Sequence, residues 1–301
     1  MNAGWHQVAF RRDIEAELTA ADIGPHRLML VDDGEHLIAY DATCPHRGTH
    51  LAYGGELDDG VVVCPFHGRR IGLGLDQPPP YCVAAHPTCD YGGSVFVLPH
   101  GEHDTGLPEY LASLAETHCF VPAFELDAPV PPEIVIENVF DTDHFTAVHG
   151  ISRRPAMSVA AGPLGRLEVE AQFETVAPRL WGGERDGATT LVRTRFHARV
   201  FSPGIVATTL GDEQRPQVVI TAATARPAGG CTIRVTLAVW DDGDPGPPDH
   251  ATVMALATDS RLAFEQDMAI WNHLDVHAAN HLDDADRPVA AFREFCRAFA
   301  T

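Results

Sequence analysis

Two short segments constrain this chain more than any other feature of its sequence. Residues 44–48 read CPHRG and residues 64–68 read CPFHG, so each segment offers one thiol and one imidazole on a short loop. Proline and glycine favour tight turns, which let backbone amides approach a thiolate sulfur. Two loops that each pair a cysteine with a histidine predict that both meet around one metal centre.

The ligand chemistry narrows the kind of metal centre. In a Rieske [2Fe–2S] cluster, two thiolates hold one iron and two imidazoles hold the other. Cys44 and Cys64 would then bind one iron, and His46 and His67 the other. A structural zinc site can use the same four ligands, but zinc fingers group a cysteine pair and then a histidine pair. Because each loop here mixes the two residue types, the spacing favours the Rieske cluster.

A second pattern lies near the middle of the chain. His144 and His149 fall within residues 133–150, which follow two prolines, end at a glycine and are expected to form one helix. Two imidazoles and one carboxylate make up the facial triad of non-haem Fe(II) oxygenases. A spacing of five rotates the second side chain by about 140° on an ideal helix. Convergence on one ion therefore predicts a π-bulge or another distortion of this helix.

The carboxylate of such a triad must come from elsewhere in the chain. Asp267 lies among apolar neighbours, where a carboxylate is costly unless it is paired or bound to a metal. Glu265 and Asp275 are the alternatives. His273 and His277 are four residues apart, but we interpret them as ordinary polar positions of a helix.

The hydrophobic patterning predicts an α+β chain. Short strands separated by Asp-Gly turns are expected at 26–31, 37–41, 61–64 and 92–98. Longer alternating strands are expected at 166–176, 189–201, 205–210, 217–225 and 232–240, and helices at about 250–280 and 289–300. We predict a small all-β domain over residues 1–115, followed by a catalytic domain over residues 116–301 in which an antiparallel sheet packs against helices.

Composition excludes several classes of partner. The 301 residues carry 42 acidic and 21 basic side chains, a formal charge of −21, without any basic stripe. Nucleic acid and anionic membranes are therefore not expected to bind. The N-terminus lacks the pattern of a signal peptide and the apolar runs are short, which predicts a cytoplasmic protein without a membrane span. Seven cysteines spread over a chain of this length do not suggest a disulfide framework.

The motifs together resemble the α-subunits of Rieske non-haem iron oxygenases over nearly the whole chain. Residues 266–273 read QDMAIWNH and residues 286–295 read DRPVAAFREF, which resembles the end of 3-ketosteroid 9α-hydroxylase oxygenases and cholesterol 7-desaturases. The resemblance implies a Rieske domain on a helix-grip (START-like) catalytic domain, assembled as a homotrimer in which each cluster faces the iron of a neighbour. Where these relatives usually carry an aromatic residue, often tryptophan, after the second cluster loop, this chain has Arg69.

The same resemblance implies roles for individual residues. His144, His149 and Asp267 would bind a mononuclear Fe(II). Asp141 would accept hydrogen bonds from His144 and from His67 of the partner subunit, and so connect the two metal centres. Asn138 would lie beside the iron.

We therefore expect the oxygenase component of a monooxygenase that uses O₂ to hydroxylate, desaturate or cyclise a lipophilic, steroid-like or polycyclic substrate. The chain has no glycine-rich dinucleotide fingerprint, so electrons from NAD(P)H would arrive through a separate flavin reductase, a ferredoxin or both. Phe140, Phe145, Phe173, Phe196 and Trp271 are candidates to line the substrate pocket or simply to fill the core. The alternatives are a ring-hydroxylating dioxygenase, an O- or N-dealkylating Rieske oxygenase and, among non-enzymes, a redox-sensing ligand-binding module.

Overall fold

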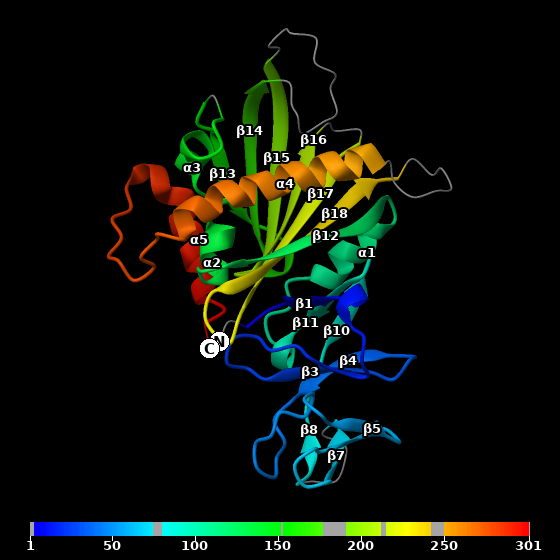
Figure 1. Cartoon of the computed structure of the whole chain (residues 1–301). Helices are drawn as coiled ribbons and strands as arrows, with labels where there is room; N and C mark the ends of the chain where they lie inside the picture. The colour runs from blue at the N-terminus through cyan, green and yellow to red at the C-terminus, as the bar shows by residue number, and fades with distance from the viewer. Residues whose placement is uncertain are drawn as a thin grey trace.

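The computed structural model describes residues 3–74, 80–151, 153–176, 191–211, 215–241 and 250–300 (Figure 1). The first hundred residues form three small sheets. Their orders are β1-β11-β10, β2-β3-β4-β9 and β5-β6-β7-β8, and only β7 and β8 pair in parallel. The strands are β1 (His6–Phe10), β2 (Leu18–Ala20), β3 (Leu28–Asp32), β4 (Leu37–Asp41), β5 (Glu56–Asp58), β6 (Val61–Val63), β7 (Arg70–Leu73), β8 (Cys82–Val83), β9 (Ala85–His86), β10 (Thr88–Tyr91) and β11 (Ser94–Val97).

A seven-stranded antiparallel sheet, ordered β12-β18-β17-β16-β15-β14-β13, is the central element of the remaining chain. Its strands are β12 (His118–Ala128), β13 (Met157–Ala161), β14 (Leu167–Val176), β15 (Leu191–Ser202), β16 (Ile205–Gly211), β17 (Gln217–Ala225) and β18 (Cys231–Trp240). The α-helices are α1 (Leu107–Ala115), α2 (Pro132–Glu137), α3 (Thr142–Ala147), α4 (His250–Trp271) and α5 (Arg287–Arg297). Short 3-10 turns occupy Arg11–Asp13, Pro99–Gly101, Pro163–Gly165 and Asp284–Asp286. The predicted α+β architecture is confirmed.

The large sheet is covered on both faces along β17, where eight of the nine residues are buried. Along β17 the side chains of Val219 and Ala223 pack into the core beneath the helices. Val218 and Ile220, on either side of Val219 in the sequence, pack on the opposite face in a second core with residues of the small β part such as Phe96. Alternation along a strand sends successive side chains to opposite faces, so this sheet joins the two halves of the molecule.

Helix α4 crosses one face of the sheet, and α2 and α3 lie near one end of it (Figure 1). The small sheet that contains β5, β7 and β8 lies at the opposite end of the molecule. Within the described part of the chain, no helix is both long enough and apolar enough to cross a membrane.

Three sequence-based expectations about the elements were wrong. Residues 133–150 do not form one helix, because the chain leaves the helical conformation at Asp141 between α2 and α3. The long helix ends at Trp271 rather than near residue 280. Strand β12 was missed, since prolines around Pro122 looked like a linker; the ladder with β18 accommodates Pro122 through a shift in register there.

Candidate metal centres

The two mixed loops have the same backbone conformation. In the first, the Cys44 amide donates to the Thr49 carbonyl at 2.8 Å and the Gly48 amide donates to the Cys44 carbonyl at 2.9 Å. In the second, the Cys64 and Gly68 amides make the equivalent bonds, at 2.8 and 2.9 Å, to Arg69 and Cys64. Gly48 and Gly68 have φ angles of 76° and 65°, a left-handed conformation that favours glycine. The repeated motif therefore builds two equivalent turns.

These turns bring the four predicted cluster ligands together. Cys44 and Cys64 are each 2% exposed, and the ring centroids of His46 and His67 are 4.7 Å apart. Nδ1 of His46 is buried and has no hydrogen-bond partner among the residues that the structure describes. A buried polar atom of this kind normally has a partner, and a metal ion would provide one.

The electrostatic surroundings of the ligands also fit a cluster. Burial raises the pKa of the Cys44 thiol, while the backbone amides of His46 and Arg47 donate hydrogen bonds to its sulfur and favour the thiolate. Burial lowers the pKa of His46, and the positive charges of Arg69 and Arg47 lower it further, so this imidazole stays neutral. Deprotonated sulfur and neutral imidazole are the states that bind metals, so the four residues fit a [2Fe–2S] cluster.

The second predicted centre lies between α3 and α4. Nε2 of His144 and Nε2 of His149 are 3.0 Å apart, and Oδ1 of Asp267 lies 4.0 and 3.5 Å from them. Helix α3 ends at Ala147, so the chain turns before His149 and brings its ring back toward His144. The expected π-bulge is not needed. All three side chains are at most 15% exposed.

The hydrogen bonds of Nδ1 fix the tautomers of both histidines. Nδ1–H of His144 donates to the backbone carbonyl of Asp141 at 2.8 Å. Nδ1–H of His149 donates to Oε1 of Gln266 at 2.9 Å. Each ring therefore keeps its lone pair on Nε2, and the two lone pairs point at one another. Such an arrangement is repulsive by itself and attractive around a cation, and a partner for the second ring nitrogen is typical of metal-binding histidines.

Desolvation sets the charges of this triad. It lowers the pKa of His144, which keeps the ring neutral. It raises the pKa of Asp267, although the nearby histidines and a hydrogen bond from Asn138 act in the opposite direction. The neutral imidazole of His144, the Nε2 lone pair of His149 and a carboxylate that is costly to bury fit a divalent iron, which would compensate the carboxylate charge.

Asp141 does not have the contact that we predicted for it within the subunit. Its carboxylate caps α3, accepting hydrogen bonds from the backbone amides of Asp143 and His144 at 2.9 and 3.1 Å. The backbone carbonyl of Asp141, and not the carboxylate, orients the ring of His144. The predicted hydrogen bond to His67 of the partner subunit stays a prediction.

The alternative carboxylates and histidines lie apart from the triad. Glu265 is exposed and pairs with Arg261 at 3.4 Å. Asp275, His273 and His277 are exposed in the segment after α4. None of these residues joins the group that could hold a metal ion, which contains only His144, His149 and Asp267 among the described residues of this region.

A cavity of about 230 Å³ opens beside the triad. Asp141, His144, Asp267 and Trp271 are among the residues that line it. Of the five aromatic residues that we considered as pocket lining, only Trp271 borders this cavity. Phe140 is fully buried against Phe292.

Phe145, Phe173 and Phe196 form a cluster of rings on the sheet side of the triad. Their ring centroids lie 4.9 to 5.9 Å apart in pairs. Phe145 also contacts the ring of His144, with centroids 4.4 Å apart. This cluster keeps water away from that side of the iron ligands.

Two contributions to the centre were missed in the sequence. Gln266 orients His149, and a bidentate ion pair, at 2.6 and 2.7 Å, joins Arg293 of α5 to Glu137 at the end of α2. Gln266 precedes Asp267 directly, but sequence alone gives no reason to aim its side chain at a histidine more than a hundred residues away.

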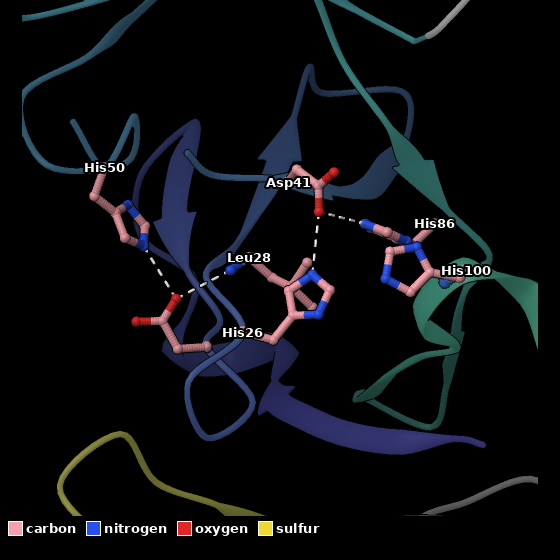
Figure 2. Close-up of polar contacts among 7 residues, drawn as sticks. His26, Leu28, Asp41, His50, His86 and His100 are labelled. Atoms are coloured by element: carbon pink, nitrogen blue, oxygen red, sulfur yellow. Dashed lines mark hydrogen bonds and ion pairs between the residues drawn. The ribbon is translucent and has the colours of Figure 1, made fainter. Parts of the chain in front are cut away.

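A second group of two histidines and one carboxylate imitates a metal site (Figure 2). Nε2 of His26 and Nε2 of His86 both lie 3.1 Å from Oδ1 of Asp41. The backbone amide of His100 donates to Nδ1 of His86 at 3.1 Å. The neutral ring of His86 must therefore carry its proton on Nε2, where it donates to Asp41. A ring with this tautomer has no lone pair for a metal between these residues, so the group is a hydrogen-bonded network.

Comparison with known families agrees with both centres. Residues 4–77 match the Rieske [2Fe-2S] domain, and residues 102–299 match the 3-ketosteroid 9alpha-hydroxylase C-terminal domain. The chain is a Rieske oxygenase. It is an oxidoreductase of a family that carries a [2Fe–2S] cluster and a mononuclear iron, and in which NAD(P)H typically supplies electrons through a reductase.

Named relatives of this Rieske oxygenase include a probable 3-ketosteroid-9-alpha-monooxygenase oxygenase component of Rhodococcus rhodochrous. The two are 25% identical, and the match covers 98% of this chain and 79% of that protein. Cholesterol 7-desaturase of Bombyx mori is 24% identical, with 97% and 68% covered. Among solved structures, NdmB of Pseudomonas putida CBB5 shares the fold with a TM-score of 0.69 at 18% identity, over 96% of this chain and 88% of that one.

Proposed function

We propose that this Rieske oxygenase hydroxylates an unactivated C–H bond of a lipophilic, steroid-like or polycyclic substrate. Cys44, Cys64, His46 and His67 would hold the cluster, and His144, His149 and Asp267 the mononuclear iron. The observation that carries the proposal is the convergence of two Nε2 lone pairs and one buried carboxylate on a single point. When bound, the iron activates O₂ with electrons supplied by the cluster.

The surroundings of the triad support a lipophilic substrate. The aromatic cluster of Phe145, Phe173 and Phe196 shields the sheet side of the triad from water. Exclusion of water from such a site protects reactive species from side reactions. Asn138 donates to Asp267 and thereby fixes the carboxylate that completes the triad. The steroid and sterol enzymes among the relatives point to the same class of substrate.

We also propose that electrons pass between subunits of a homotrimer. The cluster loops flank the small sheet at one end of the molecule, whereas α3 and α4 carry the iron ligands near the other end (Figure 1). Phe66 and Tyr53, beside the cluster, are 55% and 66% exposed. Ile270 and Leu274, at the cavity beside the iron ligands, are 53% and 43% exposed. Exposed apolar residues at both centres are typical of surfaces that contact another protein.

We propose that a ferredoxin or a flavin reductase supplies the electrons and that the enzyme is cytoplasmic. The predicted domain boundary after residue 115 belongs to the same proposal. It is supported by the small β part before it and by the large sheet after it.

A substrate screen tests the proposed reaction. The holoenzyme, supplied with NAD(P)H and a surrogate ferredoxin and reductase, is incubated with a panel of steroids, sterols and polycyclic hydrocarbons. We expect reductant consumption coupled to a product that has gained one oxygen atom, and none with His144→Ala. Turnover restricted to aryl ethers or N-methyl compounds, with release of formaldehyde, would show that the enzyme is a dealkylase.

A further inference from the structure

The tip of the small β part carries two arginines that face the cluster ligands in the same way. The rings of His67 and Phe66 lie 3.8 Å apart, and the guanidinium of Arg47 lies 5.4 Å above the ring of Phe66. The proposed cluster ligand His67 therefore has an aromatic neighbour, Phe66, whose ring contacts the guanidinium of Arg47.

The second histidine repeats the arrangement. The rings of His46 and Tyr81 pack in a T-shaped arrangement with centroids 6.2 Å apart. The guanidinium carbon of Arg69 lies 4.7 Å from the centroid of the Tyr81 ring. Cation–π contact of this kind holds a guanidinium in place without neutralising it. Arginine keeps its charge at all accessible pH values. The two positive charges are thus fixed beside the proposed cluster ligands.

Arg47 and Arg69 differ from Arg70, the next arginine in the chain, in their contacts with carboxylates. Neither Arg47 nor Arg69 makes an ion pair with a carboxylate among residues 3–74 and 80–151, where both lie. Arg70, next in sequence to Arg69, is paired with Asp58 through its side chain and also donates to the Asp58 carbonyl at 3.0 Å. The ion pair of Arg70 with Asp58 therefore contributes little net charge to the tip. The protein as a whole carries a formal charge of −21, so two uncompensated cations at this point are unusual.

A positive charge near a cluster favours its reduction. Reduction adds one electron, and with it one negative charge, to the cluster. A fixed cation stabilises that charge by an amount that falls with distance and with solvent screening. The potential of iron–sulfur clusters is set in part by nearby charge and solvent exposure. Two fixed positive charges matter in this protein because its net charge is strongly negative, and negative charges lower the reduction potential of a cluster.

We propose that Arg47 and Arg69 are potential-setting residues, which raise the reduction potential of the cluster so that a protein electron donor reduces it more readily. The inference rests on the proposed cluster ligands and is independent of the substrate. Arg69 occupies the position after the second loop where similar oxygenases usually have an aromatic residue.

Redox titration of the cluster-loaded protein tests the proposal without substrate or electron donor. We expect Arg69→Gln to lower the equilibrium constant for cluster reduction about fivefold, or ~40 mV at ~59 mV per tenfold for one electron. Arg47→Gln should act in the same direction, and the double variant should show the larger shift. Arg69→Lys keeps the positive charge, so its reduction potential should stay close to that of the wild type. The double variant Asp58→Asn/Arg70→Gln removes a paired cation and anion together, so it is the matched control and should change the potential least.

Ionic strength gives a second measure. Because both guanidinium groups are exposed, the difference between the wild type and the double variant should narrow as salt is added. Iron and sulfide content and the absorption spectrum establish that each variant holds an intact cluster. An unchanged potential in the Arg47→Gln/Arg69→Gln variant with an intact cluster at low salt would overturn the proposal, and so would a shift as large in the charge-neutral Asp58→Asn/Arg70→Gln control. A wild type that holds no [2Fe–2S] cluster would instead refute the proposed cluster ligands.

Discussion

At the scale of single residues, one hydrogen bond decides what each histidine can do. His144 and His86 belong to groups with the same composition, in each of which the possible ligand atoms all lie within 4.8 Å of one another. Nδ1 of His144 faces a carbonyl oxygen and must carry the proton, which leaves Nε2 free for a metal. Nδ1 of His86 faces a backbone amide and must be the acceptor. Residue types and distances alone would not have separated the two groups.

This difference predicts the metal content of the protein. Anaerobically prepared wild type should hold three irons and two acid-labile sulfides per chain. His144→Ala should lose one iron and retain the cluster absorption, whereas His46→Ala should lose the cluster. His26→Ala should change neither, because the His26 network is not expected to bind metal. Metal analysis decides the matter, and loss of an iron from His26→Ala would contradict our tautomer assignment.

Gln266 should determine how tightly iron is held. Removing the partner of a metal-binding imidazole typically lowers metal affinity by about 10- to 100-fold. We expect that loss for Gln266→Leu, since His149 would lose its hydrogen-bond acceptor. Gln266→Glu keeps an acceptor and should bind iron at least as well as the wild type.

Titration of the apoprotein with Co(II), followed by its visible absorption, measures this affinity without turnover. Glu265→Gln is the control from the same helix, because Glu265 pairs with the exposed Arg261. Equal affinities of Gln266→Leu and Glu265→Gln would show that Gln266 has no role in positioning His149.

At the scale of elements, the break between α2 and α3 builds the iron centre. One continuous helix would direct His144 and His149 to different sides. The chain instead caps α3 with Asp141, and α3 ends before His149. The carbonyl of the capping residue is then available to orient His144. The cap at Asp141 and the end of α3 at Ala147 therefore bring the two histidines together without the π-bulge that their spacing predicts.

Variants of Asp141 separate its capping role from its charge. Asparagine is as good an N-cap as aspartate, so Asp141→Asn should leave the stability nearly unchanged. Asp141→Ala should lower the free energy of unfolding by about 1 kcal/mol, as measured in denaturant. If the charge connects the two metal centres between subunits, Asp141→Asn should keep both metals and slow reoxidation of the reduced cluster by orders of magnitude.

Single-turnover experiments with a pre-reduced cluster measure that rate. Asp143→Asn is the control, since Asp143 forms an exposed ion pair with Arg154. Equal reoxidation rates for Asp141→Asn and wild type would refute the bridging role and leave Asp141 as a helix cap.

At the scale of the whole molecule, the positions of the two metal centres favour assembly. The small sheet beside the cluster loops and the helices α3 and α4 beside the iron ligands lie toward opposite ends of the molecule (Figure 1). A single subunit therefore offers no short path between them. A neighbouring subunit, placed head to tail, would supply one.

Mixed assemblies test this directly. His46→Ala subunits lack a working cluster and His144→Ala subunits lack the iron, so each variant alone should be inactive. If electrons cross between subunits, co-expression of the two should restore part of the activity, because a cluster of one variant can face an iron of the other. Light scattering gives the mass of the assembly. A trimeric mixture without activity would show that electron transfer stays within one subunit.

The sequence by itself determined the α+β class, nine of the eighteen strands that the structure describes and the residue types of both metal centres. It could do so because metal ligands are few and because strands buried on one face alternate visibly, as Ile233, Val235 and Leu237 do in β18. Strand β12 was missed because its single proline, Pro122, removes a backbone donor from the pattern of a strand, although a register shift accommodates this residue.

Only the tertiary structure decided which contacts surround the ligands. Gln266 reaches His149 across 117 positions of sequence, and the amide of His100 fixes the ring of His86. Such contacts depend on the packing of α4 against the sheet and of one turn against a strand, which no local pattern encodes. The position of a proton on an imidazole follows from those contacts. For this reason the sequence could name candidate ligands, whereas the fold determined which of the two similar groups is prepared for iron.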